Sequence, residues 1–245
     1  YSIEDLVENT SFEEVTHLLL YGELPDTRQL DSFSARMRAS RQVSAPILDM
    51  VRQFPADAHP MELLQAVVGY LSGYTDHKIH HGPHCNCRDT LHQVVQLATV
   101  VAALHRLRAG KEFVEPRLDL SHGANFLYML RGEEPTELEG RIMDQCLILH
   151  AEHSFNASTF TARVVASTMS TCYASISAAI GALYGSLHGG ANERVMQMVD
   201  EIGTPDRARD WVLDTLKRKQ KIREMGHRVY GAEDVRVKVI EEDLK

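Results

Sequence analysis

One histidine of this chain stands beside two glycines, and histidine is the side chain whose charge changes most readily near neutral pH. In the stretch SLHGGANERV, residues 186–195, His188 is followed by Gly189 and Gly190. Glycine weakens a helix interior, so the stretch allows two interpretations. Either a glycine caps the preceding helix and His188 lies in its last turn, or the glycines let a ligand approach the backbone closely and His188 points at that ligand.

A second group of polar residues occurs in LILHAEHSFNAST, residues 147–159. His150 and His153 are three residues apart, which predicts that they share one helix face, and Asn156 and Ser158 follow shortly. In one interpretation these are hydrogen-bonded polar groups inside a helical core. In the other, two histidines, an amide and a hydroxyl at helical spacing form part of a ligand site.

A third group occurs in EMGHRVYGAEDVR, residues 224–236. Gly226 precedes His227 and allows the backbone to turn sharply there. Arg236 offers a guanidinium group, which can bind a carboxylate through two parallel hydrogen bonds. Three histidines on three segments, together with one arginine, predict a site for a small polyanionic ligand that bears a carbonyl group.

The remaining histidines fall into a loop cluster and a scattered set. The stretch DHKIHHGPHCNCRD contains four histidines with Cys85 and Cys87, which are ligand types for zinc. The cysteines lack the paired spacing of a structural zinc site, and Gly82 and Pro83 indicate a surface loop. We therefore expect incidental metal affinity there and no designed metal site. Five scattered histidines receive no role: His17, His59, His92, His105 and His122.

The elements that must position these residues are almost all helices. Ser11 and Glu14 form a capping-box pattern, Pro60 stands at a first helical position, and Gly110 follows a long apolar run. Alternating strand patterns are essentially absent, so we predict an all-α fold. The expected helical stretches are residues 10–25, 31–40, 44–54, 59–74, 90–110, 121–132, 137–153, 206–225 and 231–244. Between residues 157 and 186, nineteen of thirty residues are Ala, Gly, Ser or Thr, which predicts a closely packed helical centre.

Composition excludes several classes of protein. The 245 residues carry a net charge of −8, which argues against nucleic-acid binding. The densest basic run, residues 217–223, is predicted to be a solvated helix face. We find no apolar run near eighteen residues, no secretory signal and no disulfide spacing, so we expect a cytoplasmic protein that does not bind membranes. The chain begins at Tyr1 and has no methionine before Met37, which indicates an excerpt of a longer protein.

Three segments in order, HAEHSFNASTFTARVVAST, AAIGALYGSLHGGANE and GHRVYGAEDVR, resemble the citrate synthase family, including its 2-methylcitrate synthases. The segments FEEVTHLLLYGELP, AHPMELL and SHGANFLYMLRGEEP resemble the large domain of the same family. The resemblance implies a multi-helical large domain over residues 1–192 and an incomplete small helical domain over residues 193–245. The small-residue segment 157–186 is compatible with a homodimer interface.

The resemblance also implies an activity. Family members are acyltransferases of the tricarboxylic acid cycle that condense oxaloacetate with acetyl-CoA and then hydrolyse the thioester, giving citrate and CoA. No cofactor is bound permanently, because the coenzyme A thioester is a co-substrate. The alternatives are a 2-methylcitrate synthase that uses propionyl-CoA, a weakened paralogue that binds without turnover, or a helical metal-binding protein that uses the His/Cys loop.

Site residues carry over position by position. His188 matches the histidine that donates a hydrogen bond to the thioester carbonyl, and His227 matches the one that polarises the ketone of oxaloacetate. His153 and Arg236 match the residues that hold oxaloacetate. A histidine at a helix N-terminus is kept neutral by the helix dipole, so His188 can serve as a hydrogen-bond donor. Residues expected to orient the histidines are Asn156, Ser158 and Asn192.

The chain also departs from the family pattern. No residue matches the aspartate that acts as the base in enolisation, so we expect the chain to be inactive alone. Ser186 and Val235 stand where proline is usual, which removes rigidity at a turn. Glu224 and Met225 stand where a glycine and a phenylalanine are usual, beside an anion site. These changes leave a sluggish or substrate-shifted paralogue open.

Overall fold

The computed structural model describes residues 1–74, 88–152, 154–220, 222 and 236–237. Within these residues, capping side chains mark where helices begin. The Ser11 hydroxyl accepts from the Glu14 N–H, and the Glu14 carboxylate accepts from the Ser11 N–H at 2.7 Å. Pro60 occupies the first helical position of its helix, and Gly110 follows the longest helix at a φ of +67°. The three local predictions made from these residues are confirmed.

The described part of the chain contains twelve α-helices and no strand, so the all-α prediction is confirmed. The first six are α1 Ile3–Asn9, α2 Phe12–Tyr21, α3 Thr27–Ala39, α4 Ala45–Gln53, α5 Pro60–Ser72 and α6 Arg88–Arg108. The other six are α7 His122–Arg131, α8 Glu137–Ala151, α9 Ala157–Ser167, α10 Cys172–Tyr184, α11 Gly190–Ile202 and α12 Pro205–Lys217. The helix α1 was not predicted.

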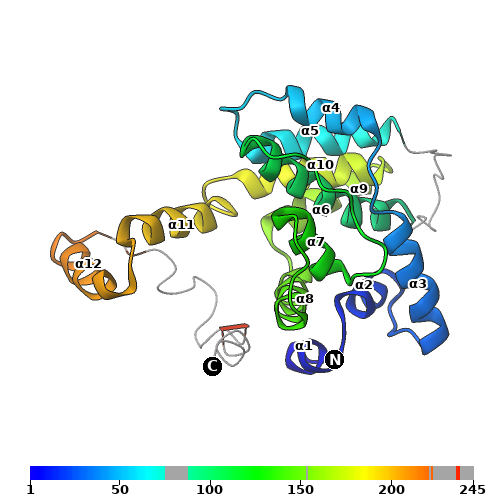
Figure 1. Cartoon of the computed structure of the whole chain (residues 1–245), viewed down its shortest axis with the longest axis horizontal. Helices are drawn as coiled ribbons and strands as arrows, with labels where there is room; N and C mark the ends of the chain where they lie inside the picture. Colours follow the sequence, from blue (N-terminus) through cyan, green and yellow to red (C-terminus); the bar gives the residue numbers. More distant parts are fainter. Residues whose placement is uncertain (75–87, 153, 221, 223–235, 238–245) are drawn as a thin grey trace.

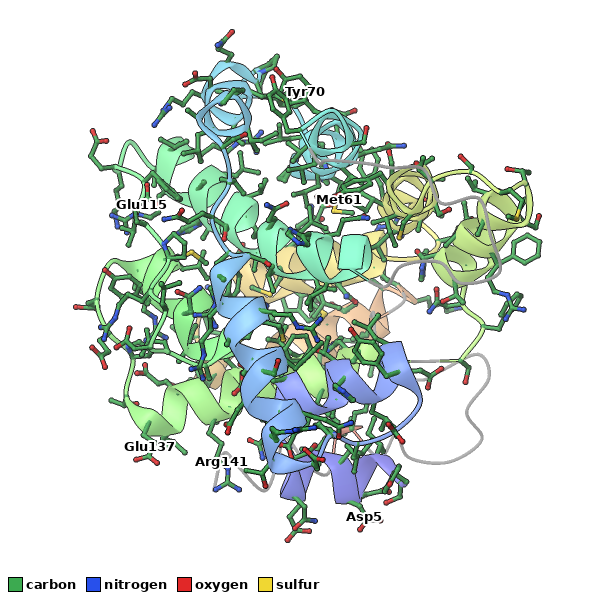
Figure 2. The ribbon with its side chains drawn as sticks, turned by 90° about the vertical axis from the view of Figure 1, so that its right-hand side faces the viewer. Asp5, Met61, Tyr70, Glu115, Glu137 and Arg141 are labelled. Carbon is green, nitrogen blue, oxygen red and sulfur yellow. The ribbon has the colours of Figure 1, made fainter. Side chains whose placement is uncertain are left out.

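Ten of these helices gather into one body, while α11 and α12 extend away from it (Figure 1). Charged side chains lie at the rim of the body, as Asp5, Glu137 and Arg141 do in Figure 2. The helix α11 has no buried residue, and α12 buries only Thr215. The predicted domain boundary between residues 192 and 193 falls inside α11, and the division stays a prediction.

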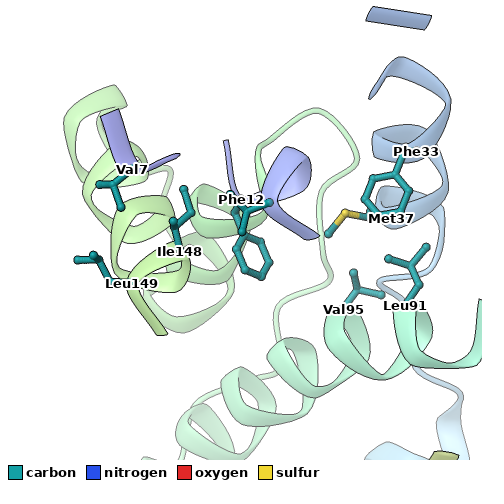
Figure 3. Packing of buried hydrophobic residues seen from close by; sticks show 9 residues of the cluster. Val7, Phe12, Phe33, Met37, Leu91, Val95, Ile148 and Leu149 are labelled. Carbon is teal, nitrogen blue, oxygen red and sulfur yellow. The ribbon is translucent and has the colours of Figure 1, made fainter. Parts of the chain in front are cut away.

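Two apolar clusters form the core, and α6 contributes to both of them. The first cluster joins α1, α2, α3, α6 and α8 and includes Phe12, Phe33 and Ile148 (Figure 3). The second joins α4, α5, α6 and α10 through residues such as Leu63 and Tyr173. Because one helix connects the two clusters, the position of α10 is tied to the rest of the body.

Two predictions about the C-terminal half need correction. The small-residue segment does not form a packed centre throughout: α10 packs on α5, but α9 has no buried residue. The helix predicted over residues 206–225 ends at Lys217, and Lys219 has a φ of +56°. Arg218 and Lys219 of the basic run therefore lie past the end of α12, and Lys221 and Arg223 lie outside the described residues. Of the helix predicted over residues 231–244, only residues 236 and 237 are described.

Candidate functional site

His188 lies at the start of α11, because α10 ends earlier in the chain. Gly185 caps α10, and the His188 N–H donates to the Gly185 carbonyl at 2.9 Å. The Ala191 N–H then donates to the His188 carbonyl at 3.1 Å, which opens the next helix. The interpretation that Gly189 or Gly190 caps the preceding helix is therefore wrong. The glycines instead bring a helix start up to the histidine.

Close packing explains why residue 189 is a glycine. A Cβ atom at Gly189 would lie 2.5 Å from the Leu183 carbonyl oxygen and 2.8 Å from a methyl group of the same residue. Any larger residue would push the start of α11 away from the end of α10. At Gly190 the nearest atom would be the Gly185 carbonyl oxygen, at 3.3 Å. The Gly-Gly pair thus lets the chain fold tightly back on α10.

The side chain of His188 meets Ser158, which is thirty residues earlier on α9. Ser158 Oγ lies 2.9 Å from His188 Nε2 and 3.1 Å from the Ala179 carbonyl oxygen. The hydroxyl has one proton. If it donates to the Ala179 carbonyl, Nε2–H is the donor to Oγ; if it donates to Nε2, the neutral ring carries its proton on Nδ1. In the second of these states, the half-buried His188 keeps an Nδ1–H that can be offered to a ligand.

Asn156 acts on the helix that carries Ser158. Its side-chain oxygen accepts from the Thr159 N–H at 3.0 Å, which caps the start of α9. Asn192 lies in the first turn of α11 and is exposed. The structure therefore places Asn156 and Asn192 at the starts of the two helices that flank the Ser158–His188 contact.

The other predicted site residues are only partly described. His153 and His227 lie outside the described residues, and Arg236 is described and half-buried. The helix predicted over residues 137–153 ends two residues earlier, and the shared face of His150 and His153 stays a prediction because His153 is not described. The helix α8 ends at Ala151, Glu152 is extended, and Ser154 has a φ of +57°. His150 points to solvent, and its Nδ1 donates to the Cys146 carbonyl at 2.6 Å.

The His/Cys loop, residues 77–87, lies outside the described residues. Elsewhere in the described chain, no three His, Cys, Asp or Glu side chains converge closely enough to hold a metal ion. None of the described helices has both the length and the apolar character that crossing a membrane requires.

Sequence reasoning gave no role to His59, which the structure places against the His188 segment. Its Nε2 lies 3.2 Å from a Glu193 carboxylate oxygen, and its ring stacks on Tyr184. The pattern HPME could have identified His59 as a helix cap, because Pro60 and Glu62 follow it at capping positions. The contact with Glu193 spans 134 residues of sequence and has no local signal.

Comparison with known proteins points to one family. The family described as "Citrate synthase, C-terminal domain" matches residues 1–245. The chain is 41% identical over 238 residues to the citrate synthase of Deinococcus radiodurans, which covers 97% of this chain and 63% of that protein. It is 42% identical over 257 aligned positions to 2-methylcitrate synthase 1 of Corynebacterium glutamicum, covering 100% of this chain and 66% of the relative.

Solved structures agree with the sequence relatives. The chain superposes on citrate synthase from Pyrobaculum aerophilum with a TM-score of 0.86 at 41% identity, covering 99% of this chain and 63% of the other. It superposes on citrate synthase from Thermoplasma acidophilum, solved with carboxymethyl coenzyme A and oxaloacetate, with a TM-score of 0.85 at 29% identity. That match covers 98% of this chain and 63% of the other chain.

Proposed function

Because this chain belongs to the citrate synthase family, we propose that it acts as an acyltransferase that condenses oxaloacetate with acetyl-CoA to give citrate and coenzyme A. The chain spans 63% of the length of the D. radiodurans relative, and the activity is proposed for the protein that contains it. The observation that carries the proposal is the contact between Ser158 and His188 at the start of α11.

The geometry supports a hydrogen-bonding role for His188. When the Ser158 hydroxyl donates to Nε2, the Nδ1–H of His188 is the donor that a ligand carbonyl can use. A donor fixed in advance stabilises the negative charge that develops on the thioester oxygen as the methyl carbon loses its proton. We assign His227, His153 and Arg236 to oxaloacetate, and we assign no residue of this chain to the base.

A second candidate reaction uses propionyl-CoA and gives 2-methylcitrate. Sequence identity does not separate the two reactions, because a 2-methylcitrate synthase is 42% identical and a citrate synthase 41% identical to the chain. A third candidate is a paralogue that binds oxaloacetate without turnover. The sequence has no disulfide-framework spacing, which supports a reducing compartment, and we place the protein in the cytoplasm.

The test is thiol release by the full-length protein that contains this chain, supplied with oxaloacetate and either acetyl-CoA or propionyl-CoA. We expect release with at least one thioester, and the ratio of the two rates identifies the acyl group. His188→Ala should lower the rate by about 10²- to 10³-fold, the usual effect of removing one preorganised donor. His150→Ala, at an exposed histidine on α8, is the matched control and should retain the wild-type rate.

Two outcomes would contradict the proposal. A folded wild-type protein that released no thiol from either substrate would support the binding-only paralogue. A His188→Ala variant as active as wild type would remove His188 from the mechanism. Circular dichroism of each variant separates loss of activity from loss of fold.

A further inference from the structure

His59 has a defined hydrogen-bonding state at the start of α5. The Met61 N–H donates to His59 Nδ1 at 3.2 Å, so Nδ1 must be the unprotonated nitrogen of the ring. The His59 N–H in turn donates to the Glu62 carboxylate at 3.2 Å, which completes a capping box. In the neutral ring the proton therefore lies on Nε2, and that nitrogen is a donor.

The same ring contacts both ends of the connection that carries His188. Nε2 lies 3.2 Å from Glu193 Oε2, in the first turn of α11. The ring also stacks on Tyr184, the last residue of α10, with centroids 4.4 Å apart and planes 29° apart. Tyr184 precedes His188 by four residues and Glu193 follows it by five. One imidazole thus spans the segment that holds the candidate site histidine.

Little else in the described structure fixes the start of α11. Gly189 is its N-cap and supplies no side-chain hydrogen bond, and the helix has no buried residue. Hydrophobic burial, which orients most helices, therefore contributes little here. The direction in which α11 leaves the body depends on the tight turn at residues 185–189 and on the contacts of His59.

We propose that His59 is a positioning residue. Its contacts with Tyr184 and Glu193, which we call the clasp, attach the segment from Tyr184 to Glu193 to α5 and so hold His188 against Ser158. The expected effect on turnover rests on the proposed function, while the clasp itself can be tested without measuring activity. The Glu193 and His59 side chains are 52% and 29% exposed, so their pairing adds little stability. The pair matters instead for the position of His188, because small displacements of a catalytic donor lower the reaction rate strongly.

The variants separate the functions of the ring. His59→Asn keeps a side-chain oxygen that can cap α5, but it removes the Nε2–H and the stacking surface. Glu193→Ala removes the acceptor, and Glu193→Gln keeps an acceptor oxygen while removing the charge. Glu201→Ala is the control, at an exposed glutamate on the same helix.

The first measurement is amide hydrogen exchange over residues 188–192. The amides of Gly189 and Ala191 are hydrogen-bonded within the connection, so opening of the clasp exposes them. His59→Asn and Glu193→Ala should each raise their exchange rates about two- to fivefold, the range expected for exposed pairs. The double variant should show no increase beyond that of His59→Asn, because this change already breaks the contact with Glu193. Unchanged exchange in both single variants would overturn the clasp.

The second measurement is steady-state thiol release. We expect His59→Asn and Glu193→Ala to lower kcat about tenfold with little change in KM for oxaloacetate, and Glu193→Gln to restore most of the rate. Equal losses of kcat in Glu201→Ala, or wild-type kcat in His59→Asn, would overturn the positioning role. Wild-type protein that releases no thiol contradicts the proposed function alone, and the exchange data then decide the clasp.

Discussion

At the residue scale, the most unusual environment is a buried ionisable cluster beneath the start of α7. The His122 N–H donates to the Glu13 carboxylate at 3.0 Å, and the Gly123 N–H donates to the Asp144 carboxylate at 2.8 Å. The pKa of Asp144 is raised to about 6, mainly by burial and further by the negative charge of Glu13. The pKa of His122 is lowered to about 4, mainly by burial and further by the positive charge of Arg41. Both groups are therefore favoured in their neutral forms.

These two pKa shifts predict opposite pH dependences of stability. The folded protein holds a proton on Asp144 that the unfolded chain releases above pH 3.8, so this contribution falls as pH rises from about 4 to 6. The unfolded chain protonates His122 below pH 6.5 and the folded protein resists this, so that contribution falls as pH decreases from about 6.5 to 4. In wild type the two slopes oppose each other over their common range.

Single substitutions should reveal each slope. In His122→Gln the Asp144 contribution remains, and the free energy of unfolding should fall by up to about 3 kcal/mol from pH 4 to 6. In Asp144→Asn the His122 contribution remains, and stability should rise with pH over the same range. Urea unfolding at half-unit steps from pH 4 to 7 measures both. Variants that keep the wild-type slope would show that this cluster does not titrate as described.

At the element scale, two glycines allow α7 and α8 to cross closely. A Cβ atom at Gly123 would lie 2.5 Å from the Asp144 carboxylate and 2.9 Å from the Asp144 backbone nitrogen. A Cβ atom at Gly140 would meet the Ala124 methyl at 3.1 Å. The close crossing is what brings Asp144 of α8 within hydrogen-bond distance of the Gly123 N–H in the first turn of α7.

Gly123→Ala should destabilise the protein by about 1–3 kcal/mol, because the added methyl meets backbone that cannot move without separating the helices. Gly69→Ala is the matched control, since Gly69 lies inside α5 and an added Cβ there meets no atom within 4 Å. It should stabilise the protein by up to about 1 kcal/mol, as alanine favours helix. Thermal unfolding compares the two. Equal shifts of Tm would contradict the close-crossing explanation.

At the scale of the whole molecule, α9 exposes an apolar face. Phe160 and Val164 are one turn apart on this helix and are 56% and 50% exposed. Phe155 and Met169, at the two ends of the helix, are exposed as well. Exposed apolar patches of this kind mark interaction surfaces. A homodimer is therefore the assembly that we propose for this surface.

Val164→Asp should convert the protein from dimer to monomer, because it places an unpaired charge in the centre of that face. Light scattering coupled to size-exclusion chromatography measures the mass directly. The control is Leu138→Asp, which changes an exposed leucine at the start of α8 and should leave the mass unchanged. A monomeric wild type, or a Val164→Asp variant that stays dimeric, would exclude α9 as the interface.

The sequence by itself determined most of the described helices and several of their ends. Ser11 with Glu14, Pro60 and Gly110 act within a turn of the chain, so their effects can be read without knowing the fold. The motifs around His188 were sufficient to identify the family, because their order and spacing recur in its members. The helix start at the two glycines was predicted only with the family resemblance, because the stretch by itself allowed two interpretations.

Only the tertiary structure decided which side chains meet. Ser158 reaches His188 across thirty residues, and His59 reaches Glu193 across 134, through the packing of α5, α9 and α10. The end of α8 at Ala151 was also missed, since His150 and His153 have a spacing that suits a helix. Local interactions act over about four residues, whereas contacts between helices depend on how apolar faces pack, and that is a property of the whole chain.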